Sequence, residues 1–222
     1  MNRADAYFFD IDGTLLVTRD LVHWNALHQA MLEVYSIDTT IEGLPYHGKT
    51  DVAILRAALN RCGVTQEDFY KKLPNALTVV CREVTAHVSG IAAEVCPAIP
   101  EILSQIQDMG KLLGLASGNL ESVGWHKVSA AGLRDFFAVG SFGDQCEQRA
   151  AIFHNAVELA KSKLGTGAKV CFVGDTPDDI HAARLVSAQI IAVSTGSFGF
   201  QDLAALHPDE CCQSCADLIG RM

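Results

Sequence analysis

The 222 residues of this chain are enough for one large domain, or one and a half, when a domain averages about 150 residues. Hydrophobic residues make up 49% of the chain and charged residues 19%, which is typical of a globular protein and excludes a disordered one. The formal charge of −9 at pH 7 excludes nonspecific binding to nucleic acid or to anionic membranes, because both need a cationic face.

Acidic residues interrupt the apolar start of the chain. Asp5 and Asp10 break the first hydrophobic run, so we expect no signal peptide. No segment contains the roughly 18 consecutive apolar residues that a membrane helix needs. We therefore expect a cytoplasmic protein without a membrane or nucleic-acid partner, either a monomer or a homodimer.

Five short apolar segments, bounded by Gly, Asp or Ser, predict buried strands. In chain order they are Tyr7–Ile11, Leu112–Ser117, Phe136–Ser141, Val170–Gly174 and Gln189–Thr195. Helical patterns over residues 100–109, 120–131 and 150–163 separate the later strands. Strands that alternate with helices form βαβ units. The sequence therefore predicts an α/β fold with a doubly wound parallel sheet flanked by helices.

The long segment between the first two strands lacks this alternation. Residues 23–35 and 51–62 carry amphipathic helical patterns. A third helix is expected to begin near Thr65 and to be interrupted by Pro74, with a further helix over residues 77–88. We expect helices and no strand in this insert.

The insert divides the chain into two predicted domains. An insert that follows the end of a strand lies over the crevice where open α/β sheets bind ligands. We therefore predict a core domain of residues 1–16 and 93–222, and an all-helical cap domain of residues 17–92.

Carboxylates follow two of the predicted strands at the point where each strand ends. Asp10 and Asp12 stand at the end of the first strand, and Asp175 and Asp179 follow the fourth. The carboxyl ends of parallel strands meet at one edge of the sheet, so these side chains would lie close together and repel one another. A hard divalent cation would relieve that repulsion, and the absence of Cys or His at suitable spacing favours Mg²⁺.

A hydroxyl side chain and an amide side chain stand at the end of the second strand. Ser117, Gly118 and Asn119 lead from this strand into the next helix. A hydroxyl group beside the free N–H groups of a helix N-terminus can hold an anion. An Asn that only caps the helix is the alternative. Beside the predicted carboxylates, a phosphoryl group held between metal and helix explains the pattern better.

Three cysteines lie near the C-terminus and raise the question of a second metal site. They are Cys211, Cys212 and Cys215, with His207 as the nearest further ligand. Their spacing is not that of the paired ligands of a zinc site. We expect them to serve as small apolar residues.

Three motifs, each at a strand end and in this order, carry a resemblance to a known family. They are Asp10-Ile11-Asp12-Gly13-Thr14, the run LGLASGN that ends at Asn119, and Gly174-Asp175-Thr176-Pro177-Asp178-Asp179. Over its whole length the chain resembles the haloacid dehalogenase-like hydrolases. Within them it looks most like the phosphoglycolate phosphatase-type branch, a similarity that Gly48-Lys49-Thr50-Asp51 also carries. The resemblance implies a Rossmann-like sheet of strand order 5-4-1-2-3 and a helical cap inserted after the first motif.

The resemblance also implies catalytic roles. Asp10 would attack phosphorus and form an aspartyl-phosphate. Asp12 would protonate the leaving group and then take a proton from water. Ser117, with the N–H groups near Gly118 and Asn119, would hold the phosphoryl oxygens.

The same resemblance implies a ligand set for Mg²⁺. Asp10, the backbone carbonyl of Asp12, and Asp175 would be direct ligands. Asp179 would act through water or as a support. The cation would neutralise the repulsion between a carboxylate and a phosphate dianion.

Two cations are candidates for contacts with the substrate. The third family motif usually has a Lys at the start of the helix after the third strand, but here no Lys lies between that strand and Lys161. Arg149 stands near that helix start, and its forked guanidinium can bridge Asp10 and a phosphoryl oxygen. In the insert, Lys49 is the leading contact for an anionic substrate, with a solvated loop charge as the alternative.

Together these features predict a Mg²⁺-dependent phosphatase for a small phosphorylated metabolite, with phosphoglycolate as a candidate. In the family that the chain resembles, members that cleave carbon–halogen bonds lack the second aspartate, here Asp12. Two alternatives stay open. A phosphomutase of the β-phosphoglucomutase type would keep the same residues, and a non-catalytic phosphate-binding module would use the same fold.

Overall fold

The computed structural model describes residues 4–144 and 146–221. Within these residues the central sheet has six strands, all parallel, in the order β5-β4-β1-β6-β7-β8. The strands are β1 (Ala6–Phe9), β4 (Leu112–Ala116), β5 (Val139–Ser141), β6 (Val170–Gly174), β7 (Gln189–Val193) and β8 (Glu210–Cys212). This architecture confirms the predicted α/β fold with a parallel sheet.

The predicted order of the strands is also confirmed. When β1, β4, β5, β6 and β7 are numbered 1 to 5 along the chain, the sheet from β7 to β5 has the order 5-4-1-2-3. The sheet continues beyond β7 with β8, which the sequence did not predict. Only three residues form β8, and two of them are half-buried, so they carry no clear apolar pattern.

Five helices cover the two faces of the sheet. They are α4 (Ile99–Asp108), α5 (Glu121–Ala130), α6 (Arg149–Leu164), α7 (Pro177–Leu185) and α8 (Phe200–Ala204). Successive side chains of a strand face opposite sides of the sheet. Tyr7 and Phe9 of β1 accordingly pack with α4 and α5, whereas Ala6 and Phe8 pack with α6, α7 and α8. Burial of both sets explains why the strands appear in the sequence as continuous apolar runs.

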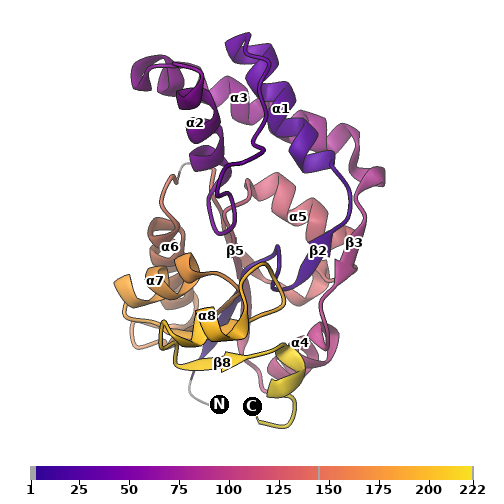
Figure 1. Ribbon diagram of the computed structural model, residues 1–222. Helices are drawn as coiled ribbons and strands as arrows, with labels where there is room; N and C mark the ends of the chain where they lie inside the picture. Colours follow the sequence, from indigo (N-terminus) through magenta and orange to yellow (C-terminus); the bar gives the residue numbers. More distant parts are fainter. Residues whose placement is uncertain (1–3, 145, 222) are drawn as a thin grey trace.

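Three further helices form a layer of their own, at the top of the view in Figure 1. They are α1 (Val22–Tyr35), α2 (Asp51–Arg61) and α3 (Gln66–Ala86). Their shared hydrophobic cluster includes Leu27, Met31, Leu55 and Val80. Leu120, just before α5, and Val123 of α5 also belong to this cluster, so α5 lies between the three helices and the sheet. None of the described helices is long and apolar enough to cross a membrane.

The expected interruption at Pro74 is wrong, because α3 continues through this residue. A proline inside a helix loses one backbone hydrogen bond and costs about 3 kcal/mol. The apolar stripe of α3 offsets this cost by burying Phe69, Val79, Val80 and Val84. Tertiary packing therefore overrides the local signal.

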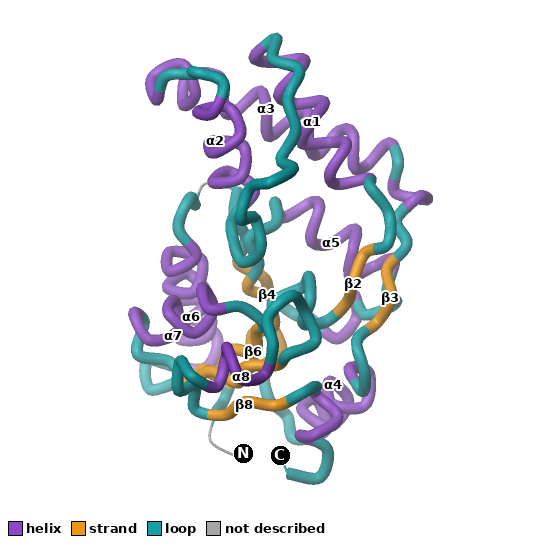
Figure 2. The backbone as a smooth tube through the Cα atoms, viewed as in Figure 1, coloured by secondary structure: helices purple, strands orange, loops and turns teal. Residues whose placement is uncertain are grey.

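A small antiparallel pair of strands connects the three helices to the sheet. It consists of β2 (Leu16–Thr18) and β3 (Ala93–Val95), both visible in Figure 2. The expectation of an insert without strands is wrong here, because β2 extends past residue 16. A strand of three residues is too short to show an alternating pattern. The domain boundaries at residues 17 and 92 stay a prediction.

Three single-turn 3₁₀ helices complete the described elements: η1 (Val88–Gly90), η2 (Arg134–Phe136) and η3 (Cys215–Leu218). The last of them contains Cys215, which is buried beside Cys212 in the cluster that covers one face of the sheet. Cys211 is half-buried against the other face. These three cysteines therefore pack as apolar residues, as expected.

Candidate active site

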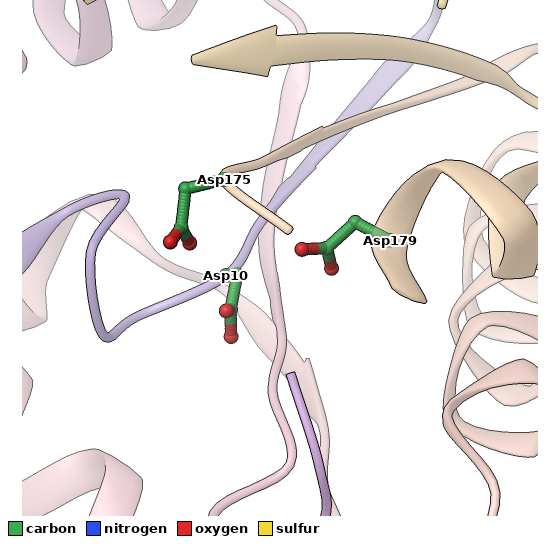
Figure 3. Close-up of side chains that lie close together, drawn as sticks. All are labelled: Asp10, Asp175 and Asp179. Atoms are coloured by element: carbon green, nitrogen blue, oxygen red, sulfur yellow. The ribbon is translucent and has the colours of Figure 1, made fainter. Parts of the chain in front are cut away.

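Three carboxylates gather where β1 and β6 end. Asp10 follows β1, Asp175 follows β6, and Asp179 lies in the first turn of α7. Figure 3 shows the three side chains close together. One carboxylate oxygen of each lies within 4.8 Å of the others, and all three side chains are buried. Thr176 caps α7 and fixes Asp179, because its N–H donates to Asp179 Oδ2 at 3.0 Å.

A glycine lets the chain turn beside these carboxylates. Gly13 has a φ of +84°, and a Cβ atom there would lie 2.4 Å from Asp175 Oδ2. Only glycine combines this backbone conformation with so close an approach. The turn also places Asp12 at the same edge of the sheet as Asp10.

Burial and mutual repulsion disfavour the ionised carboxylates. Burial raises the pKa of Asp10 from 3.8 to about 6, against the opposing charge of Arg149 and with added repulsion from Asp179 and Asp12. Burial and the charges of Asp10 and Asp179 raise the pKa of Asp175 well above its ordinary value. One guanidinium does not balance three carboxylates. This donor set fits a hard divalent cation, which prefers oxygen ligands and would neutralise the remaining charge.

We expect a divalent cation such as Mg²⁺ to stabilise the fold more strongly as the pH rises through about 6. In the metal-free protein, the raised pKa of Asp10 contributes stability that is present below pH 3.8 and is lost as the pH rises through about 6. The cation binds the ionised form, so its stabilising effect grows over the same range. Melting temperatures with Mg²⁺ and with a chelator, at about pH 5 and about pH 7, measure the difference.

The matched control for this measurement is Asp10→Asn, which cannot titrate at this position. Its melting temperature should respond less to Mg²⁺, with a weaker dependence on pH. An equal Mg²⁺-induced shift at both pH values in the wild-type protein would contradict the expected ligand role of Asp10.

Arg149 is buried and connects the carboxylates to the insert. It begins α6 and is 8% exposed. Its Nη2 atom lies 2.7 Å from Asp10 Oδ2, and its Nε donates to Asp179 Oδ1 at 2.6 Å. Its Nη1 donates to the carbonyl oxygen of Gly48 at 3.2 Å. Nη2 forms an ion pair with Asp10 but makes no hydrogen bond among the described residues. This buried group beside Asp10 can therefore also contact an anion.

Asp12 belongs to a second polar network. Lys127 Nζ donates to its Oδ1 at 2.9 Å and to its Oδ2 at 2.7 Å. Asn119 Nδ2 donates to Asp12 Oδ2 at 2.7 Å and to Ser117 Oγ at 2.9 Å. Burial alone raises the pKa of Asp12, but the Lys127 charge and these hydrogen bonds outweigh it and hold the pKa below its ordinary value. The network joins the first and second motifs.

The sequence pattern alone did not identify Lys127. This residue lies on α5 and is 4% exposed. It stands four residues after Val123, which is fully buried on the same helix face. The sequence signal that could have identified Lys127 is its position on the apolar face of a predicted helix.

The loop between β4 and α5 contacts a turn of the insert. Gly118 carbonyl oxygen accepts from Asp51 N–H at 3.0 Å, and Asp51 Oδ2 accepts from Leu120 N–H at 2.8 Å. A Cβ atom on Gly118 would lie 2.4 Å from the carbonyl oxygen of Lys49. Thr50 caps α2 through its side chain, which accepts from Ala53 N–H at 3.1 Å. The turn at residues 48–51 is therefore packed directly on the second motif.

A cavity of about 610 Å³ lies between the sheet edge and the insert, which lines it with α1, α2 and the loop between them. Its lining includes eight of the nine residues selected from the sequence: Asp10, Asp12, Lys49, Ser117, Gly118, Asn119, Arg149 and Asp175. Asp179 contacts this lining through Arg149. From the insert, His23, Trp24, Leu27 and Tyr46 form part of the wall. The structure thus brings the predicted site residues together around one cavity.

Lys49 is the most exposed of the charged residues selected from the sequence. Its side chain is 44% exposed, and Nζ lies 2.5 Å from Asp178 Oδ2. An exposed ion pair of this kind contributes little free energy, about 0 to 1 kcal/mol. The ammonium group can therefore exchange Asp178 for another anion at little cost.

The structure has the two features that the sequence motifs predicted for a hydrolase. They are a parallel sheet with carboxylates at its carboxyl edge, and an inserted helical layer that covers this edge. The family model described as haloacid dehalogenase-like hydrolase matches residues 4–186. The chain belongs to this family. The matched span contains all nine selected site residues.

Two of the relatives with known names are phosphoglycolate phosphatases. The phosphoglycolate phosphatase of Nitrosococcus oceani is 24% identical, in an alignment that covers 98% of this chain and 96% of the relative. The phosphoglycolate phosphatase of Synechococcus elongatus is 29% identical over 58% of this chain and 59% of the relative. The crystal structure of CbbY from Rhodobacter sphaeroides with phosphate has a TM-score of 0.68 at 16% identity, covering 97% of this chain and 96% of that one. The last similarity supports the fold.

Proposed function

We propose that this hydrolase is a Mg²⁺-dependent phosphatase that cleaves a phosphomonoester of a small metabolite through an aspartyl-phosphate on Asp10. The observation that carries the proposal is the buried Arg149 Nη2 group, which stands 2.7 Å from Asp10 without a hydrogen-bond partner among the described residues. A phosphoryl oxygen beside Asp10 would accept from this group. The Asp10 carboxylate and the guanidinium group of its ion-pair partner Arg149 would then contact the same phosphoryl group.

Asp10 supplies the nucleophile in this proposal. Its carboxylate oxygen attacks phosphorus, the bond to the leaving oxygen breaks, and water later hydrolyses the acyl phosphate. A bound Mg²⁺ supplies charge neutralisation between the carboxylates and the phosphoryl oxygens. Asp10, Asp175 and the backbone carbonyl of Asp12 would hold the ion. Asp179 would support it, because its two oxygens already accept from Arg149 and Thr176.

Asp12 handles the protons. It would protonate the leaving oxygen, then take a proton from the attacking water. Ser117 and Asn119, which share its network, would hold the phosphoryl oxygens together with backbone N–H groups near Gly118. These groups line the same cavity as Asp10.

Phosphoglycolate is the substrate that the two curated relatives suggest. Its leaving group carries a second anionic group, for which Lys49 at the cavity wall is the proposed partner. Lys49→Met should therefore raise KM for phosphoglycolate by about 10-fold, the scale of one lost charged hydrogen bond.

The control substrate for Lys49→Met is p-nitrophenyl phosphate, which has no second anionic group. Its KM should stay close to the wild-type value, and initial-rate kinetics with both substrates measure the difference. Equal increases in KM for the two substrates would contradict the proposed contact.

The deciding experiment is a phosphate-release screen over phosphorylated metabolites, phosphoglycolate included, with Mg²⁺ and with a chelator. The proposed phosphatase should release inorganic phosphate with Mg²⁺ and not with the chelator. A phosphomutase would leave a phosphorylated product and would need a bisphosphate activator. A non-catalytic phosphate-binding module would bind phosphate without turnover. A monomer or homodimer in the cytoplasm stays the prediction for the protein's state and location.

A further inference from the structure

Lys127 makes an unusually complete set of contacts for a lysine. The ammonium group donates to both oxygens of Asp12 and to Asn119 Oδ1, at 2.7 to 2.9 Å. An ammonium group has three N–H donors, and all three are used here. Lys127 therefore has no free donor for a phosphoryl oxygen, although it lines the cavity.

The contact with Asn119 orients a second side chain. Since Oδ1 of Asn119 accepts from Lys127, its Nδ2 group faces the opposite way and donates to Asp12 and Ser117. Lys127 thus fixes the amide of Asn119 as well as the carboxylate of Asp12. The Lys127 ammonium group thus orients Asp12 of the first motif and Asn119 of the second motif.

Stability does not explain this lysine. Its side chain is 5% exposed, and its helix neighbours Val123 and Val128 are fully buried. Its ion-pair partner Asp12 is 42% exposed, and a partly exposed ion pair contributes little to stability, about 0 to 1 kcal/mol. An apolar side chain at this position of α5 would pack at least as well.

We propose that Lys127 is a positioning residue for the phosphatase reaction, holding the Asp12 carboxylate and the Asn119 amide in the orientation that proton transfer at the substrate requires. The inference rests on the proposed function and adds a residue that none of the three motifs contains. Lys127 acts through Asp12 and Asn119, because all its donors are occupied by these two protein groups. The removal of Lys127 should therefore matter most while Asp12 can transfer a proton.

A double-mutant cycle tests this dependence. The variants are Lys127→Met, Asp12→Asn and the double variant, assayed with p-nitrophenyl phosphate and with phosphoglycolate. Lys127→Met should lower kcat by about 10- to 100-fold, the scale of a misplaced catalytic group, and leave KM near the wild-type value. In the Asp12→Asn background the same substitution should lower kcat by a clearly smaller factor, because the path through Asp12 is already lost and only the contact with Asn119 remains.

Lys127→Arg provides a rescue test. A guanidinium keeps the charge and the donors, so this variant should recover part of the lost kcat. Circular dichroism and melting temperature report the fold of each variant. If Lys127→Met does not fold, Lys127→Gln takes its place in the cycle, because the amide fills a similar volume without the charge.

The matched control is Lys111→Met. Lys111 is half-buried, and Nζ lies 3.9 Å from Asp5, next to the start of β4 and away from the cavity. The substitution Lys111→Met should leave kcat unchanged. Equal losses of kcat for Lys127→Met in the wild-type and Asp12→Asn backgrounds would overturn the inference, as would an unchanged kcat in Lys127→Met itself. Absence of phosphate release by the wild-type protein would instead overturn the proposed function.

Discussion

Asp10→Asn should abolish turnover, with kcat reduced by about 10⁴-fold or more, the scale for loss of a nucleophile. The amide has nearly the same shape as the carboxylate but cannot attack phosphorus. The fold should survive, because Asp10 is buried among other carboxylates and its neutralisation removes repulsion. Phosphate release from p-nitrophenyl phosphate at saturating substrate, with the melting temperature of the same sample, measures both effects.

A control aspartate separates this loss from a general effect of the substitution. Asp108 lies exposed at the end of α4, and Asp108→Asn should keep wild-type activity. Retention of a tenth of the wild-type rate by Asp10→Asn would correspond to only about 1.4 kcal/mol of lost transition-state stabilisation. Such an outcome would rule out Asp10 as the nucleophile.

Arg149→Ala should lower kcat by about 10²-fold or more, the scale for one lost charge-stabilising group. The substitution removes the N–H group beside Asp10 and leaves Asp10 and Asp179 without their guanidinium. Breaking a buried pair of this kind also destabilises a fold by about 3 to 5 kcal/mol. The melting temperature should therefore fall, and kcat is measured well below it. Arg149→Lys should recover part of kcat, since it restores charge without the fork.

Arg82 offers the matched control for Arg149. It is half exposed and pairs with Glu33 and Glu83 away from the cavity, so Arg82→Ala should keep normal kcat. Near-normal kcat in Arg149→Ala would mean that another cation stabilises the phosphoryl group. Lys161 is not that cation, because it lies three turns along α6 and pairs with Glu158.

The central sheet and most of the candidate site could be predicted because both depend on strand ends. The inner strands β1, β4, β6 and β7 are buried on both faces and are therefore visible as apolar runs. Residues that follow such runs must meet at one edge of the sheet. Asp10, Ser117 and Asp175 were found in this way, although their sequence positions are far apart. Arg149 was found because the local sequence offers no other cation at the start of α6.

The features that escaped prediction depend on contacts distant in sequence. Lys127 is identified by its partner Asp12, which lies 115 positions away. Pro74 is tolerated because α3 packs along α1. The strand β8 forms because it pairs with β7. Local patterns contain none of these partners. Contacts between residues distant in sequence therefore determine where the fold tolerates a residue or an element that the local sequence pattern disfavours.

The pairing of β2 with β3 has a consequence for how this chain is assembled. Thr18 lies opposite Ala93, so the chain leaves the core and returns to it at neighbouring positions. In topological terms the whole helical layer is the loop of a β-hairpin. Paired strands lie about 5 Å apart, and a turn of two to five residues can join them. The connectivity of the sheet does not depend on α1, α2 and α3. These helices instead supply the cover over Leu120 and Val123, and α1 and α2 supply part of the cavity wall.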